Sequence, residues 1–160
     1  MMGDENELTH LNEAGEVHMV DVGDKEVTRR EAIAEGFVEM SPGLADRFFA
    51  GDLPKGDAAA VARIAGISAA KKTSELIPLC HPIPLSGVEV VLESTGHGIR
   101  VVATVSTDSR TGVEMEAMTA VSVAALTIYD MVKSVERGVS LDSVRLLRKS
   151  GGRTGTWERI

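Results

Sequence analysis

The stretch VEVVLESTGHGIRVVATVST, residues 88–107, gives the clearest indication of the fold. Two runs rich in β-branched residues, 88–93 and 99–107, are separated by a short segment that contains two glycines. In the second run, alternate positions share one face of an extended chain, and these are Ile99, Val101, Ala103 and Val105. The stretch therefore predicts a β-hairpin and, with it, an antiparallel sheet.

The longest predicted helix follows this hairpin, over residues 113–137. Gly112 precedes the helix and Gly138 closes it, while Lys133 and Arg137 complement the negative end of the helix dipole. The middle of the helix, residues 117–129, is apolar on nearly all sides. We expect this part to be buried within the fold or between subunits.

Further elements are predicted on both sides of this pair. The Ala-rich segment 57–72 predicts a helix with Asp57 as its N-cap. Apolar spacing predicts two more helices, over 27–40 and 44–49, and short β-rich runs predict strands at 18–22 and 144–147. The order of elements predicts an α+β fold, namely a ferredoxin-like split βαβ antiparallel sheet with helices on one face and extra N-terminal helices.

We expect a single domain over residues 1–160, with flexible tails at 1–7 and 151–160, because no repeat and no long linker divides the chain. The 17 Lys and Arg residues against 24 Asp and Glu residues argue against general attraction to nucleic acid or anionic membranes. The aromatic content of 3% is too low for a platform that stacks bases.

The chain has no uninterrupted apolar stretch of about 20 residues, which a membrane span requires. Its acidic start lacks the features of a secretory signal. The single cysteine, Cys80, forms no disulfide within the chain, which suits a reducing compartment. We expect a cytoplasmic protein that binds neither membrane nor nucleic acid.

Residues 78–84, Pro-Leu-Cys-His-Pro-Ile-Pro, contain three prolines that prevent a helix and stiffen the loop that carries His81. A solvated histidine on a rigid connector is one interpretation of this loop. A zinc site is the other, but the adjacent Cys80 and His81 lack the spaced second pair of ligands that zinc usually has. No metal site is therefore predicted.

Two groups of ionisable residues mark the ends of the long helix. Glu114 and Glu116 complement its positive end, and their spacing turns them to different sides, so at most one is expected to face a given pocket. Near the other end, Asp130 and Lys133 are neighbours on one face. They form either a surface ion pair or a proton donor beside an acceptor.

Glu114 and Asp130 are separated by roughly 24 Å along an unbroken helix. They can serve one small ligand only if the helix of a second subunit brings its opposite end to the site. Cations for an anionic ligand are available at Lys55, Lys71, Lys72, Lys133 and Lys149. The segment 149–155 is either a flexible tail or one that closes over a ligand.

Several blocks of sequence together resemble the cyclic pyranopterin monophosphate synthase family, the MoaC family. They are LTH at 8–10, HMVDV at 18–22, KGD at 55–57, LIPLCHP at 76–82, TGVEMEA at 111–117, LTIYDM at 126–131, VRLL at 144–147 and KSGG at 149–152. Each block is short, but their common order extends the resemblance over nearly the whole chain.

The resemblance implies a lyase of molybdenum cofactor (molybdopterin) biosynthesis. Such an enzyme converts (8S)-3',8-cyclo-7,8-dihydroguanosine 5'-triphosphate, a nucleotide-derived substrate made by a radical SAM GTP cyclase, to cyclic pyranopterin monophosphate and releases pyrophosphate. The family forms homohexamers, trimers of dimers, with sites at dimer interfaces. No cofactor is implied, and a divalent ion such as Mg²⁺ is compatible with the reaction but not required.

The resemblance also assigns residues. It implies catalytic roles for Asp130, Lys55, Lys133 and His81. Substrate contacts would come from Leu79, Cys80, His81, Glu114, Met115, Glu116, Lys149, Arg30 and Lys71. Arg153 stands where the family usually has lysine, and its bidentate guanidinium would alter closure of the tail.

Two other classes of function compete with this one. A non-catalytic ligand-binding domain would bind the same ligand without turnover, since related folds host both kinds of protein. An RNA-binding domain would need a basic, aromatic surface, which this acidic chain with few aromatic residues does not supply.

Overall fold

The computed structural model describes residues 10–160, in which one antiparallel sheet has the strand order β2-β3-β1-β4-β5. The predicted hairpin is formed by β2 (Leu85–Ser94) and β3 (Gly98–Ser109). A side chain at Gly98 would collide with the carbonyl of Val38 on the next strand, and its φ of 151° also favours glycine. This glycine therefore lets the hairpin pair closely with β1.

The centre of the sheet is β1 (Thr28–Glu39), which pairs with β3 on one side and with β4 (Ser140–Ser150) on the other. The two-residue β5 (Trp157–Glu158) pairs with the end of β4. The Nε of Arg159 donates to the Leu146 carbonyl at 2.8 Å, so the C-terminal residues follow the edge of the sheet.

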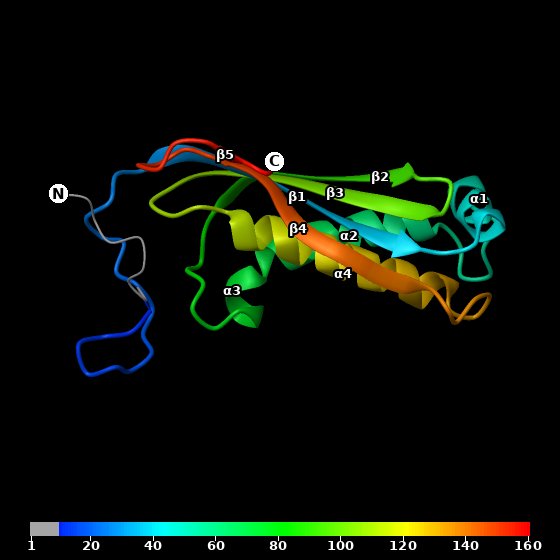
Figure 1. The fold of residues 1–160 in the computed structure, drawn as a ribbon, viewed down its shortest axis with the longest axis horizontal. Coiled ribbons are helices and arrows are strands. Elements are labelled where there is room, and N and C mark those ends of the chain that lie inside the picture. The colour runs from blue at the N-terminus through cyan, green and yellow to red at the C-terminus, as the bar shows by residue number, and fades with distance from the viewer. Residues whose placement is uncertain (1–9) are drawn as a thin grey trace.

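The helices are α1 (Pro42–Ala50), α2 (Ala58–Lys71), the short α3 (Thr73–Leu76) and α4 (Glu114–Val132). Figure 1 shows α2 and α4 together under one side of the sheet. They approach closely at Gly66, where a Cβ would lie 3.0 Å from the Ala120 carbonyl oxygen and 3.3 Å from the Ala124 Cβ. Small residues thus set the distance between the two helices.

Within residues 10–160, α4 is the one helix that is long and apolar enough to cross a membrane by length and composition. Seven of its residues have no exposed surface because they pack inside the fold, and these are Ala117, Ala120, Val121, Ala124, Ala125, Ile128 and Val132. The apolar composition of α4 is therefore that of a core helix. Of the two alternatives that the sequence left open, burial within the fold and burial between subunits, the first accounts for these residues.

The prediction of a helix over residues 27–40 is wrong, because this segment is the central strand β1. Every second residue of this strand faces the helices, as in other strands. Three of these residues, Ala32, Ala34 and Gly36, are small and lack the β-branched side chains that indicate a strand in a sequence. Gly36 is required there, since a Cβ would lie 2.8 Å from the Val121 Cγ1 on α4. The fold therefore has no extra helix at this position, and α1 and α2 lie between β1 and β2.

The predicted strand at 18–22 is also absent, because these residues run without a partner strand. The final helix ends at Val132, five residues earlier than predicted for 113–137, and β4 extends well beyond 144–147 at both ends. The predictions for 44–49, 57–72 and the hairpin are confirmed by α1, α2 and the β2–β3 pair. The tail predicted at 1–7 lies outside the described residues.

The face of the sheet opposite the helices carries ion pairs. The Glu35 carboxylate on β1 is buried and accepts hydrogen bonds from the Nε of Arg100 at 2.7 Å and the Nε of Arg145 at 2.8 Å. Burial alone would raise the pKa of this carboxyl, but the hydrogen bonds and charges of the two arginines lower it. These pairs join β1 to both of its neighbouring strands.

Candidate active site

The loop after α3 and the first turn of α4 form the walls of a pocket of about 520 Å³, called the first pocket below. Residues 77–84 cannot continue α3 because of their prolines, so they cross in front of the α4 N-terminus as a loop. A third wall comes from the segment before β1. The lining residues are His10, Val20, Val22, Lys25, Ile77, Leu79, Cys80, His81, Ile83, Thr111, Gly112, Glu114, Met115 and Glu116.

His81 is half-buried in this wall, and its Nε2 lies 2.7 Å from the carbonyl oxygen of Val20. A carbonyl oxygen only accepts hydrogen bonds, so Nε2 carries the proton and donates. In the neutral ring, Nδ1 is then the nitrogen with a free lone pair. A proton taken up by His81 during a reaction would therefore arrive at Nδ1.

Glu116 is buried in the first turn of α4, with only 4% of its surface exposed. The pKa of its carboxyl is raised to about 7, because burial and the charge of Glu114 outweigh a hydrogen bond to the backbone that lowers it. Both glutamates border the first pocket, so the expectation that at most one would face a given pocket is wrong. The cavity wraps around the first turn of the helix and reaches two of its sides.

Cys80 is the other ionisable group in this wall. Its burial raises the pKa of its thiol, and the charge of Glu116 raises it further. The thiol therefore stays protonated at neutral pH, which makes it a weak nucleophile and suits it to contact rather than to covalent chemistry.

Replacing Glu116 by glutamine is expected to stabilise the protein above pH 7 and to change little near pH 4.5. Between its usual value of 4.5 and its folded pKa of about 7, the Glu116 carboxyl binds more protons in the folded than in the unfolded state. Stability therefore falls as the pH rises through this window, by about 3 kcal/mol at most. Urea unfolding of both proteins at pH 5 and pH 8 measures the difference.

Glu75→Gln is the matched control, because Glu75 is an exposed glutamate on the nearby α3. An equal gain from Glu116→Gln at both pH values would show that ionisation of the buried carboxyl is not the cause.

A second pocket, of about 730 Å³, adjoins the first and shares Lys25, Thr111, Gly112 and Glu114 with it. Five cationic and three acidic side chains line it, so its net charge is opposite to that of the whole chain. The charged residues are Lys25, Arg30, Arg110, Lys149 and Arg153 with Asp24, Glu26 and Glu114; Thr28, Thr111, Gly112, Gly152 and Thr154 complete the wall.

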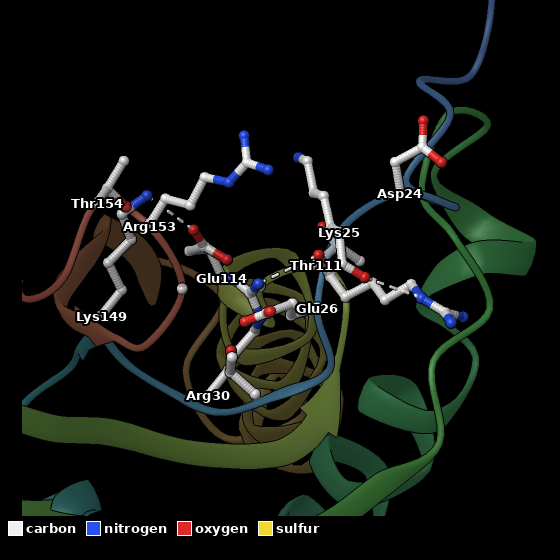
Figure 2. A pocket seen from close by; sticks show the side chains of 13 residues that line it. Asp24, Lys25, Glu26, Arg30, Thr111, Glu114, Lys149, Arg153 and Thr154 are labelled. Atoms are coloured by element: carbon white, nitrogen blue, oxygen red, sulfur yellow. Dashed lines mark hydrogen bonds and ion pairs between the residues drawn. The ribbon is translucent and has the colours of Figure 1, made fainter.

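Figure 2 shows Lys25 and Arg153 extending toward one another from opposite sides of this second pocket, above Glu114. The Lys149 Nζ lies 3.0 Å from the Glu114 Oε1 and is held by it. The charged ends of Arg153 and Lys25 thus approach each other across the pocket, an arrangement that suits an anionic ligand.

The opposite end of α4 carries a separate cluster, formed by Lys55, Asp130 and Lys133. The Asp130 carboxylate lies 3.0 Å from the Lys55 Nζ and 2.8 Å from the Lys133 Nζ. Hydrogen bonds from Lys133 and Lys55 lower the pKa of Asp130, and the pKa of Lys133 is raised by Asp130. Lys55 reaches Asp130 because the turn before α2 lies beside the end of α4.

Residues 19–152 match the MoaC family. The chain belongs to this family. Three relatives of this MoaC chain are named cyclic pyranopterin monophosphate synthase. They come from Corynebacterium efficiens (54% identical, covering 95% of this chain and 98% of the relative), Chloroflexus aurantiacus (55%, 96% and 96%) and Thermomicrobium roseum (54%, 96% and 93%).

In this MoaC chain, eight of the residues assigned from the resemblance lie at the N-terminal end of α4. They line one pocket or the other and are Arg30, Leu79, Cys80, His81, Glu114, Met115, Glu116 and Lys149. The other cluster lies at the far end of the same unbroken helix, roughly 24 Å away. Lys71, at the exposed end of α2, lines neither pocket.

Two cations of the MoaC chain's second pocket, Lys25 and Arg110, were not assigned from the sequence. Each stands just outside a block that was recognised, Lys25 after HMVDV and Arg110 directly before TGVEMEA. Their closeness to these blocks is the feature of the sequence that could have identified them as site residues. Among residues 10–160, no group of three or more His, Cys, Asp and Glu side chains is arranged to hold a metal ion.

Proposed function

We propose that this chain is a cyclic pyranopterin monophosphate synthase of molybdenum cofactor biosynthesis. It would convert (8S)-3',8-cyclo-7,8-dihydroguanosine 5'-triphosphate to cyclic pyranopterin monophosphate with release of pyrophosphate. The observation that carries the proposal is the identity of 54% to 55% with relatives of that name over nearly the whole chain. The two adjacent pockets at the start of α4 support it, since one is largely apolar and the other cationic.

The chemistry of the two pockets suits different parts of such a substrate. The first pocket offers apolar walls from Val20, Leu79 and Met115, with His81 and Glu116 beside them, and would take the ring system. The second pocket offers Lys25, Arg30, Lys149 and Arg153 to the phosphates. Negative charge that develops on phosphate oxygens as pyrophosphate leaves would be stabilised by cations fixed in advance.

Rearrangement of the ring requires proton transfers, and the first pocket holds two groups suited to them. Nδ1 of His81 carries a free lone pair and can accept a proton, because Nε2 is the nitrogen that donates to Val20. The pKa of Glu116, about 7, also places it near working pH, where a general acid or base is most effective.

We further propose that the complete site lies between two subunits. Asp130 is about half exposed, with 54% of its side chain accessible, and so are its two lysine partners. One turn before it on α4, Leu126 is 59% exposed, and Ile64 on the neighbouring α2 is 65% exposed. Exposed apolar residues beside a charged cluster fit a subunit contact that brings Lys55, Asp130 and Lys133 to the pockets of a partner.

The assembly we propose is the homohexamer, a trimer of dimers, expected from the family resemblance. The substrate would be supplied by a radical SAM GTP cyclase. We place the protein in the cytoplasm, because a single cysteine suits a reducing compartment.

We also infer a single domain with a ferredoxin-like split βαβ core. The order β1, α2, β2, β3, α4, β4 and the sheet order β2-β3-β1-β4 support this inference.

The test of the function is release of pyrophosphate by the purified protein when it is given the cyclised GTP intermediate. We expect one pyrophosphate for each substrate consumed, and none from GTP, whose purine has not been cyclised. Binding of the intermediate without any release would instead favour a non-catalytic ligand-binding domain.

A further inference from the structure

The segment before the central strand, residues 10–27, is called the arm below. In Figure 1 it lies at one end of the sheet, on the side of the loop that follows α3. It contains no helix or strand, and Leu11 and Val17 form an isolated bridge within it. Its backbone hydrogen bonds in the described structure stay within the arm, for example from the Lys25 N–H to the Val22 carbonyl.

Two side chains of the body hold the arm. Within residues 10–160, its hydrogen bonds to the rest of the chain are those donated by His81 Nε2 to the Val20 carbonyl, at 2.7 Å, and by Arg110 Nε to the Lys25 carbonyl, at 3.0 Å. Each fixes a different point of the arm. The placement of Lys25 therefore depends on Arg110.

The position of Lys25 matters because this residue borders both pockets. Val22, three residues earlier, borders the first pocket, and Glu26 borders the second. A shift of this end of the arm would change the wall that the two cavities share.

Arg110 is itself well anchored. It follows the end of β3, and Arg30 on β1 donates through Nε to the Ser109 carbonyl, at 3.0 Å, and through its terminal nitrogen to the Arg110 carbonyl, at 3.2 Å. The sheet thus fixes the backbone of Arg110, and the Arg110 side chain fixes the arm.

We propose that Arg110 is a positioning residue for the reaction, which acts by holding the Lys25 end of the arm against the body. Only the expected effect on KM rests on the proposed function. The role of Arg110 in holding the arm does not depend on it. Removal of one hydrogen bond with a charged donor is expected to raise the population of the released arm by about tenfold.

Limited trypsin digestion of the full chain measures release of the arm without any substrate. In Arg110→Ala, cleavage after Lys25 is expected to be about tenfold faster than in wild type, because a protease acts on the released form. Cleavage after the exposed Lys72 serves as the internal reference and is expected to be unchanged. Faster cleavage at both sites would indicate general destabilisation and would overturn the proposal.

Arg29→Ala is the matched control. Arg29 is a neighbouring exposed arginine on β1 that contacts Ser86 and Asp108 and lines neither pocket. Its loss removes the same charge and is expected to leave both cleavage after Lys25 and turnover unchanged.

Kinetics with the cyclised intermediate completes the test. In Arg110→Ala, KM is expected to rise about tenfold while kcat stays near wild type, since a mispositioned wall weakens binding of substrate and transition state alike. Arg110→Lys distinguishes the effect of the charge from that of the hydrogen bond to the arm, because lysine keeps a cation in the pocket but lacks the Nε donor. We expect KM and the Lys25 cleavage rate to change together across the variants.

Two results would overturn the proposal. One is cleavage after Lys25 at the wild-type rate in Arg110→Ala. The other is a raised KM in a variant whose arm is cleaved at the wild-type rate, which would mean that Arg110 acts directly on the substrate. If the wild-type protein released no pyrophosphate, the proposed function would fail, and the digestion would still decide whether Arg110 holds the arm.

Discussion

Asp130→Asn is expected to reduce the rate of pyrophosphate release by about 100- to 10,000-fold, the range typical for loss of a group that positions or transfers protons. Asparagine has nearly the same shape, but it lacks the charge that holds Lys55 at 3.0 Å and Lys133 at 2.8 Å. Without the carboxylate, the two ammonium groups would repel each other and lose their common orientation. Single-turnover release of pyrophosphate measures the effect.

The fold should survive this substitution, because the Asp130 side chain is 54% exposed and surface ion pairs add little stability. Unfolding in urea checks this directly. Asp52→Asn is the matched control, since Asp52 forms an exposed pair with Arg47 at 3.5 Å and lines neither pocket. Activity of Asp130→Asn within a few-fold of the control would remove Asp130 from the catalytic residues.

The sequence predicts those elements of this fold that carry strong local signals. The hairpin has regular alternation, α2 has Asp57, whose side chain accepts from the Ala60 N–H at 3.0 Å, and α4 has a long apolar run. All three were predicted correctly in kind. The predicted end of the last helix was wrong, because α4 stops at Val132 although the helical sequence pattern continues to residue 137.

The central strand was missed for a physical reason. Three of its inward positions carry alanine or glycine, and at Gly36 the helix α4 lies so close that a larger side chain has no room. Ala and Glu also favour helices, so the helix prediction followed local propensity. Pairing with β3 and β4 on both sides overrode that propensity, and such pairing is not visible in a local pattern.

The site shows the same division. Residues of one block, such as Leu79 to His81, stay together in space because the chain keeps them together. Lys55 and Asp130 are 75 positions apart, and their contact depends on how α2 packs along α4. Residues 18–22 were mistaken for a strand because they favour extended backbone. They pair with no other strand in the described structure, and their contact with the rest of the fold is the hydrogen bond from His81 to the Val20 carbonyl.

Mixing two inactive variants is expected to restore activity if each site is built from two chains. One variant, Asp130→Asn, keeps intact pockets, and the other, His81→Ala, keeps an intact cluster of Lys55, Asp130 and Lys133. In a mixed dimer, one of the two sites receives His81 from the first chain and Asp130 from the second, so it is wild type in composition. The other site carries both substitutions.

Random exchange makes half of the dimers mixed, and half of their sites are intact, so activity is expected to recover to about a quarter of the wild-type value. The mixture is made by unfolding the two variants together and refolding them, and pyrophosphate release is measured. Each variant refolded alone is the control and should stay inactive.

The outcome separates two geometries. If the whole site lay within one chain, every site in the mixture would still carry one of the substitutions, and the activity would remain that of the separate variants. Such a result would contradict the shared site, because α4 is unbroken and keeps its own two ends roughly 24 Å apart. Recovery would show that His81 and Asp130 meet only when the start of one α4 approaches the end of another.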